Sequence, residues 1–240
     1  MSKALVLSSG GCDSTTLVSL AIKDFGATNV ITVSVSYGQR HSRELECAEA
    51  VAKYYNVRHE VIDLSAIFKY SNCSLLTQST EDVPEGSYSD QLNKSKSGVV
   101  STYVPYRNGL MLSAIASLGL SMFPEDEIHI YLGAHADDAA GNAYPDCSVE
   151  FTEAVARSID LGTDHQVKVD TPLVKMNKAQ VVKLGLELGT PYQLTTSCYN
   201  GRERACGVCG TCIDRINAFK ANHMIDPIPY EIDIDWEGNT

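Results

Sequence analysis

Residues 3–17 read KALVLSSGGCDSTTL, and every other inference about the chain builds on this stretch. An apolar run at 4–7 leads into two adjacent glycines at 10–11, and a helical pattern follows at once. This order is typical of a buried strand, a tight turn and a helix. Glycines let the backbone turn sharply and approach an anion, while the amides and the dipole at a helix start attract one. We therefore expect a phosphate-binding loop at residues 8–15.

Strands and helices alternate along the rest of the chain. Strands are expected at residues 3–8, 29–37, 57–63, 126–133 and 166–170, and helices at 14–25, 42–55, 107–122, 149–161, 177–188 and 212–223. The alternation predicts an α/β fold with a mostly parallel, doubly wound, Rossmann-like sheet. Ligands of such sheets bind at the carboxyl ends of the strands. The loops at 8–15, 37–41 and 133–135 should meet at that edge, bringing His41 and His135 with them.

Two segments depart from this alternation. Residues 66–100 are polar, rich in Ser, Asn and Gly, and poor in apolar anchors, which indicates an insertion or a mobile lid. The acidic tail at 226–240 is expected to be a strand or an arm. We predict one α/β domain over residues 1–190 and a metal-binding segment over 191–240 packed on it.

Composition limits the function. The 240 residues carry a net charge of −11, which counts against tRNA or DNA as a substrate, because nucleic-acid-binding proteins usually have a basic surface. The chain has no 18-residue apolar stretch, so a transmembrane helix is not indicated. The first strand leaves no room for a signal peptide. We expect a cytoplasmic protein.

Half of the eight cysteines crowd into fifteen residues with the spacing C-x7-C-x2-C-x2-C. Four thiolates can close a tetrahedral zinc site, and nearby glycines supply the turns. An iron–sulfur cluster and a pair of disulfides are the alternatives. The spacing favours a structural zinc ion. Its expected ligands are Cys198, Cys206, Cys209 and Cys212.

The glycine loop itself resembles a known type. Its SGGxDS pattern is similar to the pyrophosphate-binding loop of ATP pyrophosphatases, which cleave ATP between the α- and β-phosphates to adenylate a substrate. The other common phosphate motifs, GxxxxGK[ST] and GxGxxG, are absent from the chain. An ordinary strand, turn and helix is the alternative interpretation.

Four further blocks follow the loop in order: YGQRH at 37–41, YVPYRN at 103–108, YPDC at 144–147, and the cysteine segment, which continues to Arg215. Together with the loop they resemble the 7-cyano-7-deazaguanine synthase family, and residues 171–198 match it as well. Two positions depart from the family pattern. Tyr106 stands where a glycine is expected, and the stretch at 135–142 is slightly longer than the common form.

The resemblance implies an adenine-nucleotide-hydrolase-like fold and a ligase of queuosine biosynthesis. Its substrates would be ATP, with Mg²⁺, 7-carboxy-7-deazaguanine and free ammonia, and its assembly a homodimer without nucleic acid or membrane. The chain would also bind zinc. The alternatives are a related pyrophosphate-loop ligase that adenylates another carboxylate or a tRNA base, an NAD or GMP synthetase, and a zinc-knuckle protein that binds nucleic acid.

The resemblance also implies residue roles. The nucleotide would contact Ser8, Ser9, Gly10, Gly11, Cys12, Asp13, Ser14, Thr15, Thr16 and Leu17. The catalytic candidates are Asp13, Arg40, Arg107 and Lys178. The substrate candidates are Tyr144, Asp146, Glu150 and Arg215. Several candidates have a structural alternative: Asp13 and Asp146 as helix caps, Arg40 and Arg107 in surface salt bridges, Lys178 on a solvated helix face, and Arg215 as an anchor of the metal loop.

Overall fold

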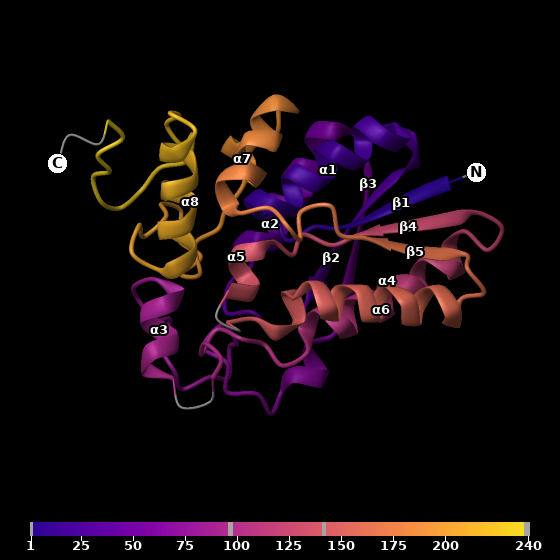
Figure 1. Cartoon of the computed structure of the whole chain (residues 1–240), viewed down its shortest axis with the longest axis horizontal. Helices are drawn as coiled ribbons and strands as arrows, with labels where there is room; N and C mark the ends of the chain where they lie inside the picture. The colour runs from indigo at the N-terminus through magenta and orange to yellow at the C-terminus, as the bar shows by residue number, and fades with distance from the viewer. Residues whose placement is uncertain (1, 96–97, 141–142, 238–240) are drawn as a thin grey trace.

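The computed structural model describes residues 2–95, 98–140 and 143–237, and its centre is a five-stranded parallel sheet (Figure 1). The strands lie in the order β3-β2-β1-β4-β5. Their bounds are β1 (Ser2–Leu7), β2 (Val30–Ser36), β3 (Arg58–Asp63), β4 (Glu127–Tyr131) and β5 (Val167–Asp170). In the register of the sheet, Val6 of β1 pairs with Thr32 of β2 and Tyr131 of β4. The predicted parallel α/β sheet is confirmed.

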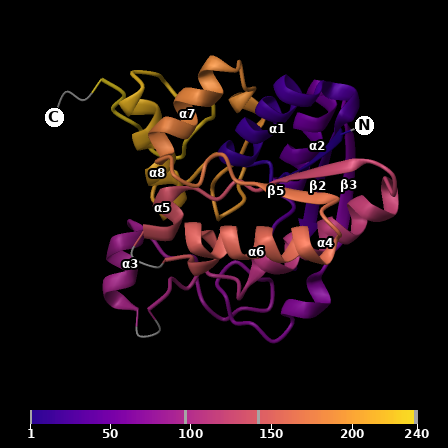
Figure 2. The same cartoon turned by 45° about the vertical axis from the view of Figure 1, so that its right-hand side comes forward.

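Helices cover both faces of this sheet (Figures 1 and 2). One face carries α1 (Cys12–Phe25), α2 (Arg43–Tyr55) and α7 (Lys178–Glu187), and the other carries α4 (Arg107–Met122) and α6 (Val149–Gly162). Strand β1 shows why both faces are covered, because its successive side chains point to opposite faces of the sheet. Val6 packs in the core with Leu17 of α1, whereas Leu5 packs in the opposite core with Ile115 of α4. The sheet is therefore doubly wound, as predicted.

Short helices complete the fold. They are η1 (Ala27–Asn29), η2 (Ser65–Phe68), α3 (Tyr88–Lys94), α5 (Ala136–Ala139), η4 (Pro145–Cys147), η5 (Tyr192–Leu194) and α8 (Gly210–Ala221). Within the described part of the chain, none of the helices has the length and apolar character needed to cross a membrane.

The segment between β3 and α4 has a core of its own. Phe68, Cys73, Leu75 and Leu76 are buried together against Tyr37, so the expectation of few apolar anchors is wrong. These anchors have no regular spacing, which is why periodicity did not reveal them. Of the expected lid at 66–100 and tail at 226–240, residues 96–97 and 238–240 lie outside the described residues, as do 141–142 of the longer stretch.

The C-terminal segment packs on the sheet domain: the Tyr192 hydroxyl hydrogen-bonds Thr16 Oγ1 at 2.8 Å, and the Asn222 side chain donates to the Ala179 carbonyl oxygen at 2.9 Å. A second set of contacts lies within the segment itself. Arg215 of α8 donates to both carboxylate oxygens of Asp226, at 2.6 and 2.9 Å, and to Thr195 Oγ1 at 2.8 Å. The Tyr192 ring lies edge-on to Phe219 of α8, with centroids 5.4 Å apart. Between residues 226 and 237 the described tail contains no strand, only an isolated bridge to Ala205, so the expected arm is the better description.

Candidate active site

A cavity opens at the carboxyl edge of the sheet, where the sequence predicted it. The ends of β1, β2 and β4 all contribute to its wall through residues 7–14, 35–39 and 132–138. The space amounts to about 1350 Å³, including the part open to solvent.

The glycine loop forms one end of the cavity. The backbone geometry of this loop explains why glycine is needed at position 10. Gly10 has φ +73°, and a Cβ there would lie 2.3 Å from the backbone oxygen of Glu44, so no larger residue fits. Helix α1 begins at Cys12 with Gly11 as its N-cap and without a side-chain cap. The amides at the start of α1 therefore have no capping side chain and can bind an anion. The predicted cap role of Asp13 is wrong, because Asp13 already lies inside the first turn.

The loop residues divide into two groups. Those that line the cavity are Ser8, Ser9, Gly11, Asp13 and Ser14. The Ser8 hydroxyl is buried and has no partner within the described residues, which suits a phosphate acceptor. The remaining predicted nucleotide residues are absent from the cavity wall: Gly10, Cys12, Thr15, Thr16 and Leu17. Thr16, for example, hydrogen-bonds the Tyr192 hydroxyl at 2.8 Å, and Leu17 belongs to the core.

Asp13 and Lys178 form an ion pair at the charged end of the cavity, with 2.5 Å between Oδ2 and Nζ. Burial disfavours the carboxylate, but Lys178 and His135 together with Arg215 outweigh burial and hold the pKa of Asp13 below its ordinary value. Burial also disfavours the ammonium, and Asp13 outweighs it, so the pKa of Lys178 is raised. Both groups are therefore charged at neutral pH.

Two more titratable side chains join this pair. His135 Nε2 lies 3.4 Å from Lys178 Nζ and 3.4 Å from an oxygen of Asp138. Burial raises the pKa of Asp138 above its usual value. The solvated-lysine alternative does not hold, because the Lys178 side chain is only 9% exposed.

Arg107 also faces the cavity, with its guanidinium 5.1 Å from the centre of the Tyr37 ring. Burial disfavours its charge, but Tyr37 and Glu44 outweigh burial and raise the pKa of Arg107. Burial likewise raises the pKa of the Glu44 carboxyl. Arg107 is therefore a fixed cation in the wall.

Asp146 and Tyr144 line the same cavity. One carboxylate oxygen of Asp146 accepts a hydrogen bond from the backbone N–H of Asn108 at 2.9 Å, near the start of α4. The helix that follows Asp146, α6, is capped by Ser148, which accepts from the Phe151 amide at 3.1 Å. The cap of α6 is therefore Ser148, so the alternative role of Asp146 as the cap of that helix is wrong; Asp146 binds the first turn of α4 instead.

Three of the predicted catalytic and substrate residues do not line the cavity. Arg40 donates to backbone oxygens of the segment after β3: Leu76 at 3.1 Å, Ser79 at 3.0 Å, and Glu81. Glu150 is exposed at the start of α6. Arg215 is fully buried in the C-terminal segment, so the anchor alternative describes its position.

The sequence interpretation missed a row of hydroxyls in the opposite wall. Three of its members come from the predicted lid, from the segment before α4 and from the cysteine segment. The row runs through Tyr88, Tyr199, Tyr144 and Thr102, with O···O distances of 2.8, 3.0 and 2.5 Å, and all four residues line the cavity. Burial raises the pKa of Tyr144 to about 12 and holds the pKa of Tyr88 well above its ordinary value, so both stay neutral. We call these four residues the hydroxyl row.

Only one member of this row had a signal in the sequence beyond the quoted blocks. Tyr199 directly follows the predicted metal ligand Cys198. The Tyr199 carbonyl oxygen lies 3.2 Å from His41 Nε2, so His41 makes a structural contact with the backbone here.

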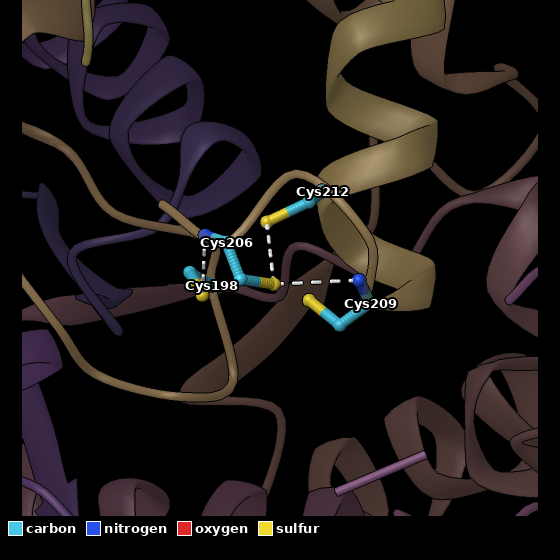
Figure 3. Close-up of side chains that lie close together, drawn as sticks. All are labelled: Cys198, Cys206, Cys209 and Cys212. Carbon is cyan, nitrogen blue, oxygen red and sulfur yellow. Dashed lines mark hydrogen bonds between the residues drawn. The ribbon is translucent and has the colours of Figure 1, made fainter. Parts of the chain in front are cut away.

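The four clustered cysteines converge as predicted (Figure 3). Their sulfurs all lie within 4.8 Å of one another, and all eight cysteines of the chain are free thiols, so the disulfide alternative is not realised here. A tetrahedral Zn–S distance of about 2.3 Å separates neighbouring sulfurs by about 3.8 Å. The sulfurs of Cys206 and Cys212 are 3.9 Å apart, and the Cys209 amide donates to the Cys206 sulfur at 3.4 Å. The donor set and its spacing therefore fit a metal ion.

The family model and the sequence relatives agree with each other. The family described as queuosine biosynthesis protein QueC matches residues 3–223. The 7-cyano-7-deazaguanine synthase of Caldicellulosiruptor saccharolyticus is 43% identical over 238 residues, covering 99% of this chain and 100% of that protein. The 7-cyano-7-deazaguanine synthase 1 of Colwellia psychrerythraea is 41% identical over 229 residues, covering 95% and 99%. Among solved structures, the NH3-dependent NAD synthetase of Campylobacter jejuni gives a TM-score of 0.47 at 12% identity, covering 80% and 66%.

Proposed function

The chain belongs to the family of the queuosine biosynthesis protein QueC and is an enzyme of the 7-cyano-7-deazaguanine synthase type; we propose that it makes its product as an ATP-dependent ligase. One observation carries the ATP dependence. The glycine loop presents an uncapped helix start and an unpartnered buried hydroxyl, Ser8, to a cavity that also holds the Lys178 ammonium. Anions bind at such a place.

The reaction converts a carboxylate into a nitrile. The carboxylate of 7-carboxy-7-deazaguanine attacks the α-phosphorus of ATP and pyrophosphate leaves. Ammonia then displaces AMP, loses a proton and gives the amide. The amide oxygen attacks the α-phosphorus of a second ATP and pyrophosphate leaves again; loss of AMP and two N–H protons then yields the nitrile. Adenylation is needed because an unactivated carboxylate oxygen is a poor leaving group, and an anion-binding loop stabilises the departing pyrophosphate.

The residues of the cavity divide this work by charge. The amides of the glycine loop and Lys178 bind the phosphates, and Asp13 orients Lys178. Arg107 is the cation for the substrate carboxylate, because it is held against Tyr37 in the wall. Tyr144 and Asp146 lie where the heterocycle would bind, whereas Arg40, Glu150 and Arg215 act from outside the cavity.

Two metal ions belong to this proposal. Mg²⁺ would accompany the triphosphate, and the free Asp13 Oδ1, which has no partner within the described residues, is an oxygen ligand suited to it. Zn²⁺ would be held by Cys198, Cys206, Cys209 and Cys212 as a structural ion, since four thiolates leave no open position for water.

The cellular setting follows the family resemblance. We propose a cytoplasmic homodimer that takes small molecules and binds neither nucleic acid nor membrane. Sedimentation at equilibrium measures the assembly, and a monomer at all concentrations would contradict this part alone.

The decisive test is the identity of the nucleotide product. ATP labelled in the base is incubated with the chain, ammonia and 7-carboxy-7-deazaguanine, and in parallel with tRNA in place of the acid. AMP and the nitrile should form only with the acid. ADP as the sole product would refute adenylation, and AMP formation that requires tRNA would favour a tRNA-modifying ligase.

A further inference from the structure

The hydroxyl row lies in a part of the cavity wall that is built mainly from aromatic and apolar side chains. Tyr144 is buried in the core below β4, and Tyr88 and Tyr103 pack against the same cluster. Tyr199 packs against the second apolar cluster, which contains Val104 and Met111. All of these residues line the cavity. A planar, uncharged heterocycle suits such a wall better than a triphosphate does.

The proton count of the row gives it a defined hydrogen-bonding capacity. Four hydroxyls carry four protons, and the three bonds of the row use three of them. One proton therefore remains for a partner outside the row. Because each hydroxyl can rotate, the spare proton can sit on any of the four oxygens, while their lone pairs accept. The row can match a ligand edge that mixes donors and acceptors.

Residues 198–209 carry three of the four clustered cysteines, and we call them the cysteine loop. This loop fixes Tyr199 and Tyr88 of the hydroxyl row. Tyr199 directly follows Cys198 in the chain. Tyr88 begins α3, and this part of the chain is tied to the cysteine loop by the bond from the Gly86 amide to the Val208 carbonyl, at 3.0 Å. Figures 1 and 2 both show α3 beside α8, into which the cysteine loop leads.

Close packing at this junction leaves little freedom. A Cβ at Gly210 would lie 3.0 Å from the Tyr88 ring, so the ring and the start of α8 are in tight contact. Glu85 also forms an isolated antiparallel bridge with Cys209. Two of the three tyrosines are thus positioned by the cysteine loop, while Tyr144 belongs to the sheet domain.

We propose that the hydroxyl row recognises the polar edge of the heterocyclic substrate, and that Tyr199 is the positioning residue through which the cysteine loop holds the row in place. This inference rests on the proposed function, since it assumes a heterocyclic acid as the second substrate. It assigns recognition to neutral hydroxyls, in addition to the carboxylate of Asp146. It also gives the cysteine loop, which does not itself carry the reacting groups, a role in substrate affinity.

The test compares Tyr199→Phe with a matched control, Tyr55→Phe. The control also removes a tyrosine hydroxyl bonded to another hydroxyl, Ser19, but outside the cavity. Tyr199→Phe splits the row and leaves Tyr88 without its partner. We expect its KM for the heterocyclic acid to rise about tenfold, as a lost buried hydrogen bond predicts, with KM for ATP within about twofold and metal content unchanged. Tyr55→Phe should leave both KM values unchanged.

Each outcome decides the matter. Unchanged KM for the acid, or an equal rise for both substrates, would overturn the proposal. If Tyr199→Phe does not fold, Tyr88→Phe and Thr102→Val at the two ends of the row replace it, with the same expected split between the substrates. Failure of the unsubstituted chain to form AMP would instead contradict the proposed function, so the two failures are distinguishable.

Discussion

The ion pair of Asp13 and Lys178 joins positions 165 residues apart, the first turn of α1 and the first residue of α7. Neither side chain is fully solvated, so each depends on the other to remain charged at low cost. The pair supplies the cavity with a fixed ammonium. Its value to the enzyme is therefore electrostatic, and its loss should appear in activity before it appears in folding.

We predict that Lys178→Met and Asp13→Asn each lower kcat/KM at least about a hundredfold, the usual effect of losing one charge-stabilising group. Each should also cost about 2 kcal/mol of stability, because one charge stays behind without its partner. The double variant should lose less than the sum. Turnover assays and urea titrations measure both effects. Lys168→Met, which breaks the more exposed pair with Asp160, is the control and should keep full activity.

Asp214 offers a test of pH dependence. Burial raises the pKa of its carboxyl from 3.8 to about 6. A carboxyl with a raised folded-state pKa favours the fold while it is protonated, and this advantage is lost as pH rises from about 4 to about 6. Asp214→Asn should therefore stabilise the chain by about 1 kcal/mol at about pH 8, after allowance for partial exposure, and by nearly nothing at about pH 4.

Chemical unfolding at both pH values measures this difference. Asp63→Asn is a control of opposite sign, since hydrogen bonds from Ser65 lower the pKa of Asp63. Its replacement should destabilise the chain at the higher pH. A pH-independent effect of Asp214→Asn would contradict the assignment.

At the scale of elements, Arg40 holds the segment after β3 in place through hydrogen bonds to its backbone. Its guanidinium and Nε reach three backbone oxygens of residues 76–81, which a lysine ammonium cannot bridge in the same geometry. We predict that Arg40→Lys accelerates hydrogen exchange of the Thr77 and Ser79 amides about tenfold, while kcat/KM falls less than about tenfold. Arg43→Lys, on an exposed pair with Glu46, should change neither. Unchanged exchange together with a hundredfold loss of activity would restore Arg40 to the catalytic set.

The cysteine loop is the second element whose role can be measured. Cys209→Ser removes one of four converging sulfurs, so we predict loss of the bound metal, a lower melting temperature and weaker binding of the heterocyclic acid. Cys73→Ser changes an equally buried thiol outside the cluster and should retain the metal. Elemental analysis of the unsubstituted chain should give about one zinc per chain. Iron with inorganic sulfide would support the cluster alternative instead.

These elements show what could be predicted from sequence. The central strands β1 and β2 are apolar runs followed by glycine-containing loops, so local pattern was enough to place the middle of the sheet and the edge of the cavity. Arg40 was correctly placed near that edge, but the direction of its side chain depends on carbonyls 36 or more positions away. Tyr88 was missed because it lies in an aperiodic polar segment, and its partners come from two distant loops. Contacts of this kind have no local signature.

At the scale of the whole molecule, the C-terminal segment is joined to the sheet domain by buried bonds. The Thr196 amide donates to the Gly10 carbonyl at 2.9 Å, so the segment directly supports the glycine loop. The Tyr192 hydroxyl hydrogen-bonds Thr16 Oγ1 of α1 at 2.8 Å. Because these contacts cross the predicted boundary near residue 190, we expect the two parts to unfold together.

Arg215→Met tests this coupling by weakening the C-terminal segment from within, because Arg215 bonds Asp226, Thr195 and Tyr192 of that same segment. The variant leaves the Asp226 carboxylate buried without its main partner, which should cost about 3–5 kcal/mol. Adding Asp226→Leu should recover much of the loss, because the stranded charge is then gone. Trp236, the single tryptophan, lies in the C-terminal segment, whereas circular dichroism reports mainly the helices of the sheet domain. The two signals should give coincident urea transitions in the unsubstituted chain and in both variants. An early Trp236 transition in Arg215→Met, with the helices still folded, would mean that the C-terminal segment is an independent unit, and the cysteine loop could then not position the hydroxyl row.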